Sequence, residues 1–218
     1  MSALDVSLEH YTERRDIAAE VVEAGLGMWQ QVNFADLAGS WARRIARLVV
    51  VLRAGQLAAA ASADEFVDYA LEEQGSRERR AGRVRATAFS GVASDGRDLE
   101  SLLLNPVIAA KVAIRDGETR ERSLASGYAS LEMLLRTQVA DAGRVADGVG
   151  IAARPRTSWT RMVVGDSCPK CIILAGQVYR YSEGFLRHPN CDCVHIPTAE
   201  DTGDDFTTDP MRAFTEGR

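Results

Sequence analysis

The sequence predicts an α+β fold that is mainly α, in which long amphipathic helices precede a small antiparallel β region stapled by zinc. Apolar residues recur at helical spacing through most of the first 142 residues, whereas segments rich in β-branched and aromatic residues appear only after residue 157. All four cysteines lie between residues 168 and 193. A sheet of so few strands is only marginally stable by itself. It is therefore expected to need a metal ion bound by these cysteines as a cross-link.

Composition argues against several classes of protein. At 218 residues the chain can bury a real core, as one domain or two small ones. A net charge of −5 and a pI near 5.3 argue against a dedicated nucleic-acid binder. The N-terminus is charged from Asp5 onward, and the longest apolar run, residues 48–52, is far too short for a membrane span. We therefore expect a protein that is made and, at first, kept in a cytoplasm.

Residues 1–95 are the first expected region and contain three helices. The first covers residues 5–32, and the second begins after an N-cap at 33–36. Their apolar stripes are Ile17, Val21, Gly25, Met28, Trp29 and Val32 in the first helix and Leu37, Trp41, Ile45, Leu48 and Leu52 in the second. A capping box at 62–65 opens a third helix, with Phe66, Tyr69 and Ala70 inward, which ends near Gly75.

A basic run follows this helix and consists of Arg77, Arg79, Arg80, Arg83 and Arg85. Such a run is either a contact for DNA phosphates or an acidic partner, or a solvated loop, and in an acidic protein the solvated loop is favoured. Residues 90–98 have the composition of a turn and are the expected hinge between the first region and the second.

Residues 96–150 are expected to form a helical hairpin. Asn105 and Pro106 fit a cap followed by proline at the first helical position, and this helix stops at Gly117. The next helix covers 118 to about 142, with a stripe of Leu124, Tyr128, Leu131, Leu135 and Val139. Four residues are then expected to loosen the chain: Gly143, Gly148, Gly150 and Pro155.

Residues 151–198 are expected to form a Cys/His zinc-binding β module. Strand character appears at 158–164, 177–181 and 192–196. Residues 199–218 are predicted to be an acidic linker tail, with a helix just beginning at Pro210.

The spacing of cysteines and a histidine in the β module predicts a metal site. Cys168 and Cys171 have the two-residue spacing that lets both sulfurs of a tight turn face one ion, and His188 and Cys191 repeat it. Cys193 follows two residues later. Residues i and i+2 of an extended segment share a face, so Cys191 and Cys193 can both point at the first pair.

A closed, structural zinc ion is the expected occupant, because zinc takes four nitrogen or sulfur ligands in a tetrahedron. Cys168, Cys171 and Cys191 are the firmest three ligands. His188 and Cys193 compete for the fourth place, and His195 is the remaining candidate. Three basic residues are near enough in sequence to offset the thiolate charge: Lys170, Arg180 and Arg187. Two disulfides are the alternative, and would suit a secreted domain or an exposed mature particle.

The Cys/His region resembles the phage Mu F-like head-morphogenesis (minor capsid) family. The matching positions are Cys168, Cys171, the GQVY segment at 176–179, the HPNCDC segment at 188–193, and Pro197. Upstream, Arg136, Thr137 and Gln138 are similar to an Arg-Thr-Glu of those proteins, with glutamine in place of glutamate. The resemblance covers about residues 120–198.

This resemblance implies a structural minor capsid protein of a tailed double-stranded DNA phage, few per particle and not an enzyme. It implies a place inside the head at the portal vertex, with the host cytoplasm as the site of assembly. The implied partners are the portal protein and other head proteins, with contact to packaged DNA during packaging or ejection as a further option. No membrane and no small-molecule substrate are expected. Residues 1–95 are the candidate partner-binding region because they lie outside the shared motifs.

Two other classes remain open. A capsid-associated hydrolase or maturation protease would need an open zinc position and a base, for which Glu183 is the obvious candidate, but thiolate ligands weaken the Lewis acidity that activates water. A zinc-dependent nucleic-acid-binding module would use Lys170, Arg180, Arg187, Tyr179 and Tyr181. Nearby acidic residues offset these cations.

Overall fold

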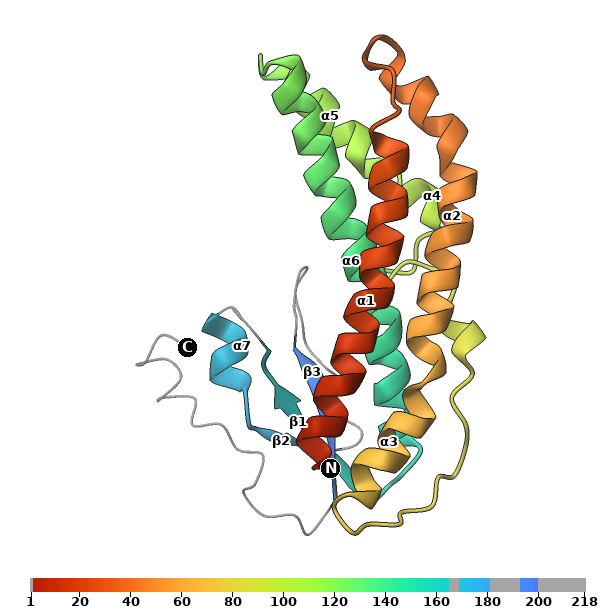
Figure 1. Ribbon diagram of the computed structural model, residues 1–218, viewed down its shortest axis with the longest axis vertical. Helices are drawn as coiled ribbons and strands as arrows, with labels where there is room; N and C mark the ends of the chain where they lie inside the picture. Colours follow the sequence, from red (N-terminus) through yellow and green to blue (C-terminus); the bar gives the residue numbers. More distant parts are fainter. Residues whose placement is uncertain (1, 165–168, 181–192, 200–218) are drawn as a thin grey trace.

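Three long helices form the body of the molecule. A computed structural model describes residues 2–164, 169–180 and 193–199 of the chain. The long helices are α1 (Ala3–Trp29), α2 (Leu37–Ala61) and α6 (Arg120–Ala152), and they pack along one another (Figure 1). The shorter helices are η1 (Phe34–Asp36), α3 (Ala63–Glu72), η2 (Ala86–Phe89), α4 (Leu99–Leu102), α5 (Asn105–Arg115) and α7 (Pro169–Leu174). The predicted helices appear in the expected order as α1, α2, α3, α5 and α6, whereas η2 and α7 were not predicted.

A small antiparallel sheet lies beside one end of the helices (Figure 1). Its strands are β1 (Thr157–Met162), β2 (Val178–Tyr179) and β3 (Val194–Ala199), in the order β2-β1-β3. Trp159 of β1 is opposite Tyr179 on one side and Pro197 on the other. The prediction of a mainly helical α+β fold with a small antiparallel sheet is therefore confirmed. The predicted tail, 199–218, lies outside the described residues apart from its first residue, which ends β3.

Side-chain caps explain where several helices begin. Ser2 caps α1 and forms a capping box with Asp5, and Asp36 accepts a hydrogen bond from the amide of Gly39 at the start of α2. The predicted capping box at 62–65 is wrong. Ser62 has the αR backbone of a residue continuing from α2, whereas an N-cap residue typically has an extended backbone, and its hydroxyl makes no capping hydrogen bond.

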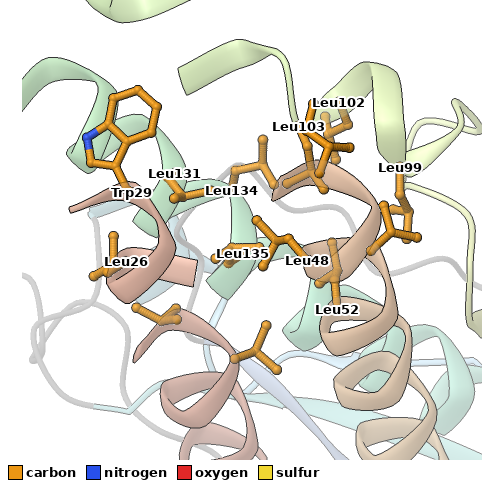
Figure 2. Close-up of a cluster of buried hydrophobic side chains, with 14 of the residues drawn as sticks. Leu26, Trp29, Leu48, Leu52, Leu99, Leu102, Leu103, Leu131, Leu134 and Leu135 are labelled. Atoms are coloured by element: carbon orange, nitrogen blue, oxygen red, sulfur yellow. The ribbon is translucent and has the colours of Figure 1, made fainter. Parts of the chain in front are cut away.

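The main hydrophobic core lies between the three long helices (Figure 2). Its labelled side chains are Leu26 and Trp29 from α1, Leu48 and Leu52 from α2, Leu131, Leu134 and Leu135 from α6, and Leu99, Leu102 and Leu103 from the α4 region. The indole of Trp41 donates a hydrogen bond of 2.6 Å to the carbonyl of Leu103. The predicted boundary between residues 95 and 96 thus does not divide the core, because both sides contribute to one cluster.

The apolar stripe of α2 is buried entirely in this core. Trp41, Leu48 and Leu52 have no exposed surface, and Leu37 and Ile45 are also buried. The stripes of α1 and α2 pack inside the fold, because α6 covers them from the other side. The segment Phe34–Glu72 would pass as a membrane span by length and composition, but the stripe inside it is this core.

Helix α6 continues past the glycines that were expected to end it. A β-carbon at Gly143 would lie 2.8 Å from Nε of Arg14, and one at Gly150 would lie 3.3 Å from a methyl group of Val67. These glycines therefore allow close approach of neighbouring elements within a regular helix, a use that sequence alone does not distinguish from a turn.

Two glycines of α6 provide a matched test of this packing. In Gly127→Ala the added methyl group would lie 2.1 Å from the indole of Trp29 and 2.8 Å from the carbonyl oxygen of Pro106, so we expect a loss of about 1–3 kcal/mol of stability. Gly148 has nothing within 4 Å of its β-carbon position, so Gly148→Ala should gain up to about 1 kcal/mol from helix propensity. Urea unfolding at pH 7 measures both. Equal stability of the two variants would contradict the contact between α1, α5 and α6.

The segment expected to be a hinge, residues 90–98, is pinned instead. Gln56 of α2 donates to the carbonyl of Val92 at 3.0 Å and accepts from the amide of Gly91 at 2.9 Å. On the other side, Gln138 of α6 accepts from the amide of Ser94 at 2.8 Å. Two side-chain amides thus hold the turn to two different helices, which explains why turn composition here does not produce a hinge.

Candidate metal centre

Two of the five predicted zinc ligands come together at one end of the sheet. Cys171 lies in α7, and Cys193 immediately precedes β3. Both side chains are buried, at 3% and 0% exposure, and they pack as one cluster with Val163 at the end of β1. The chain therefore brings the first and last parts of the Cys/His motif into contact.

The other three predicted ligands, Cys168, His188 and Cys191, lie outside the described residues. Within the described ranges, no group of three His, Cys, Asp or Glu side chains is arranged to hold a metal ion. Two buried thiols side by side fit half of a tetrahedral zinc site, since thiolate sulfur is a preferred zinc ligand. Completing the site would require two ligands from Cys168, His188 and Cys191.

Arg144 of α6 supports this pair, a role that nothing in its local sequence indicates. Its Nε donates a hydrogen bond of 2.8 Å to the carbonyl oxygen of Cys193, and its guanidinium also pairs with Asp141 at 3.2 Å. The buried arginine fixes the backbone that carries Cys193. Of the cations expected to offset thiolate charge, Arg180 is exposed and Arg187 lies outside the described residues, as does the side chain of Lys170.

His195 is built into the sheet. It is paired in register with Arg161 on β1, and its ring meets that of Trp159 edge-on, with 4.6 Å between ring centroids. Burial, the largest influence, lowers the pKa of His195 to about 3, so its imidazole is neutral at pH 7. Its described contacts are those of a packed sheet residue.

A second buried polar cluster lies between α1 and α6. Asp147 of α6 accepts hydrogen bonds from both terminal nitrogens of Arg14, one of them at 2.8 Å, and its Oδ1 lies 3.3 Å from Nε2 of His10. All three side chains are buried. The His10 ring stacks on Phe66 of α3, with 3.8 Å between centroids. One carboxylate therefore ties α1 to α6, and the histidine extends the contact to α3.

The charges of this cluster balance locally. Burial acts to raise the pKa of Asp147, but Arg14 and then His10 outweigh it and hold that pKa well below its ordinary value. Burial, followed by the neighbouring Arg14, lowers the pKa of His10. At neutral pH the cluster is thus an ionised carboxylate, a guanidinium and a neutral imidazole, which is the arrangement of a buried structural ion pair.

The sequence contains a signal for the two residues of this cluster that lie on α1, His10 and Arg14. Ser7, His10 and Arg14 continue, toward the N-terminus, the same three- and four-residue spacing that places Val21 and Gly25 in the core. Polar residues on an apolar stripe indicate buried polar groups with a partner. Nothing local marks Asp147 as that partner.

The Arg-Thr-Gln segment lies in the middle of α6. Arg136 pairs with Glu132 one turn earlier, at 3.1 Å. The side-chain oxygen of Gln138 accepts from both the amide and the hydroxyl of Ser94, at 2.8 and 3.1 Å. Both bonds use only acceptor oxygen, so a glutamate in this position could make the same contacts.

No family of known proteins matches the chain, and neither a curated protein nor a solved structure matches it. The resemblance to the Mu F-like family rests on the motif residues themselves. Glu183, the base that a hydrolytic zinc would need, and Tyr181, an aromatic of the nucleic-acid alternative, lie outside the described residues.

Proposed function

We propose that this chain is a structural minor head protein of a tailed double-stranded DNA phage, located inside the capsid and associated with the portal vertex. In this proposal the helices are the scaffold, and the Cys/His region is a metal-stapled module attached to them. The protein catalyses no reaction.

The contact between Cys171 and Cys193 is the observation that carries the proposal. The resemblance depends on a CxxC and a later Cys-x-Cys acting as one unit, and these two cysteines are 22 positions apart in the sequence yet pack together out of water. Cys171 and Cys193, with two of Cys168, His188 and Cys191, would hold the zinc ion. The ion would supply the cross-link between α7 and the sheet that a small sheet needs.

The buried His10 and Asp147 do not favour the enzyme alternative. A hydrolase would use such a pair to activate a nucleophile. Here Asp147 is shared with Arg14, and His10 is stacked on Phe66. In the described part of the chain no hydroxyl or thiol is hydrogen-bonded to the His10 ring. This arrangement supports a structural role for the pair.

A contact with the portal would have to use apolar side chains that the core leaves exposed. Three of them lie at four-residue spacing, with 40–54% of their surface exposed: Leu104, the N-cap residue of α5, and Ile108 and Val112 within that helix. They lie outside the region 1–95 that was the expected partner surface. They are the positions at which an apolar helical contact can be tested.

Expression of the protein together with the other head proteins of its phage is the decisive experiment. We expect it to fractionate with portal-containing particles, and Ile108→Glu to reduce its recovery in particles at least tenfold. Val50→Glu, at an exposed position of α2, is the matched control and should leave recovery unchanged. Quantitative mass spectrometry of purified particles measures all three.

Absence of the wild-type protein from particles would contradict the proposal. If Ile108→Glu and Val50→Glu both leave recovery intact while the wild type is present, the head location stands and the α5 contact does not.

A further inference from the structure

The segment between α3 and η2 presents its arginines in a regular way. Residues 76–80 and 83–85 have no helical structure, and a bend at 81–82 separates them. Alternate residues face solvent: Arg77, Arg79, Arg83 and Arg85 are exposed, whereas Glu78, Arg80 and Val84 are half-buried. In Figure 1 this segment is the yellow coil along the outer edge of the helical part, away from α7.

The inward residues hold this segment in place. Glu78 pairs with Arg156 at 2.8 Å, and Arg80 pairs with Asp64 at 3.3 Å. The backbone is anchored too, because the amide of Ala81 donates to the carbonyl of Ala153 at 2.7 Å and the amide of Val84 donates to Asp64 at 3.0 Å. The outward arginines are therefore carried on a backbone that is already fixed, which lowers the entropy lost on binding.

The acidic groups beneath the segment are already neutralised. Asp64 and Asp68 of α3 are matched by Arg80 and by Arg154, whose side chain has no exposed surface. Glu78 is matched by Arg156. Within the described part of the chain, no ion pair involves any of the four outward arginines, so their positive charge is not offset by those carboxylates.

We propose that Arg77, Arg79, Arg83 and Arg85 bind the phosphate backbone of duplex DNA. The planar guanidinium fork fits phosphate oxygens and keeps its charge at all relevant pH values. Alternate residues of an extended chain are about 6.6 Å apart, so each piece of the segment presents two guanidinium groups to neighbouring positions on one anionic surface. We call these four residues the arginine edge.

The composition of the segment selects the duplex over a single strand. Proteins that bind single strands combine a basic groove with aromatic side chains on which bases stack. Residues 76–85, SRERRAGRVR, contain no aromatic residue. A purely electrostatic edge reads no sequence, so its binding should be non-specific.

The net charge of −5 limits this contact but does not oppose it. Long-range attraction to DNA is weak for such a chain, whereas short-range contacts depend on local charge within about 8–10 Å at physiological salt. The sequence favoured a solvated loop here. The exposure of arginines at alternate residues and the anchoring of the backbone favour a binding surface instead. The contact rests on the proposed function only for its setting, since packaged duplex DNA is what a protein inside the head would meet.

Titration of the full chain against a labelled duplex of about 30 base pairs tests the arginine edge. Four phosphate contacts predict a slope of about −3.6 for the logarithm of affinity against the logarithm of salt concentration, and thus a loss of about a hundredfold between 50 and 200 mM salt. Replacing all four residues with serine should remove most of this slope. Arg80 is kept in this variant because it holds the segment, and circular dichroism checks that the helices remain.

A variant with the same change in net charge is the control. Arg15, Arg43, Arg115 and Arg122 are exposed, lie on other elements, and are each paired with a carboxylate. Their replacement by serine should leave most of the slope in place. Equal losses in both variants, no binding by the wild type, or equal competition by polyglutamate or single-stranded DNA would each overturn the assignment to duplex phosphates.

Failure of this proposal is separable from failure of the proposed function. If the serine variant loses DNA binding but still fractionates with particles, both proposals stand. If the wild type binds no DNA yet is recovered in particles, only the arginine edge is wrong. If it binds DNA as described but is absent from particles, only the head location is wrong.

Discussion

Replacing Asp147 with alanine is expected to destabilise the protein by about 3–5 kcal/mol, because it leaves the buried guanidinium of Arg14 without its carboxylate. The loss should be measured by urea unfolding at pH 7. The pKa of Asp147 is depressed in the folded state, so its stabilising contribution is present above the ordinary value of 3.8 and is lost as the pH falls below it. At pH 7 the full effect of the substitution is therefore expected.

Two comparisons make this result specific. Asp116→Ala breaks the exposed pair with Arg115 and should cost less than about 1 kcal/mol. Replacing Arg14 with methionine and Asp147 with leucine together should recover much of the loss, since removing both charges is far less costly than removing one. A loss below about 1 kcal/mol for Asp147→Ala would mean that Arg14 reaches solvent or another anion.

The second large effect is expected at the candidate metal centre. The wild type should contain about one zinc ion per chain, and Cys193→Ala should abolish it along with the ordered structure of β1, β2, β3 and α7. Apparent binding free energies of structural zinc are about 10–16 kcal/mol, more than a three-stranded sheet of this size supplies by itself. Elemental analysis measures the metal, and hydrogen exchange should show lost protection after residue 156 with α1 and α2 still protected.

Ile173→Ala is the matched control for Cys193→Ala. Ile173 lies in α7 beside Cys171, but it is 51% exposed, so zinc content and exchange protection should not change. A metal-free wild type with its four cysteines paired in two disulfides contradicts the zinc proposal. Uniform loss of protection along the whole chain would instead show that helices and sheet unfold as one unit.

The helices could be predicted from sequence because their stripes are long. Leu37, Trp41 and Leu48 repeat at the spacing of one helical face, and the buried residues of the structure follow that spacing. What the stripe faces could not be predicted. The periodicity of α2 is the same whether its partner is α6 or another protein, and only the path of the chain between them decides.

The errors over α6 and the site have related causes. A glycine that ends a helix and a glycine that allows close packing within one cannot be told apart in a sequence. Gly143 and Gly150 are of the second kind, because Arg14 and Val67 pack closely against them. The two-residue spacing of Cys168 and Cys171 is a local signal, whereas Cys193, which was expected only to compete with His188 for the fourth place, packs against Cys171 from 22 residues away. Arg144 and Asp147 were missed because their partners, Cys193 and Arg14, are 49 and 133 residues away.

The long-range pairing of Arg14 with Asp147 also has a consequence for folding during synthesis. The two residues are separated by 133 positions, so α1 and α2 leave the ribosome long before the carboxylate does. Chains are made at about 5–20 residues per second, which leaves this charged face of α1 waiting for about 7–27 seconds. In that interval α1 and α2 can pack against each other and against α3, but the face that they turn toward α6 is open to a chaperone until α6 docks.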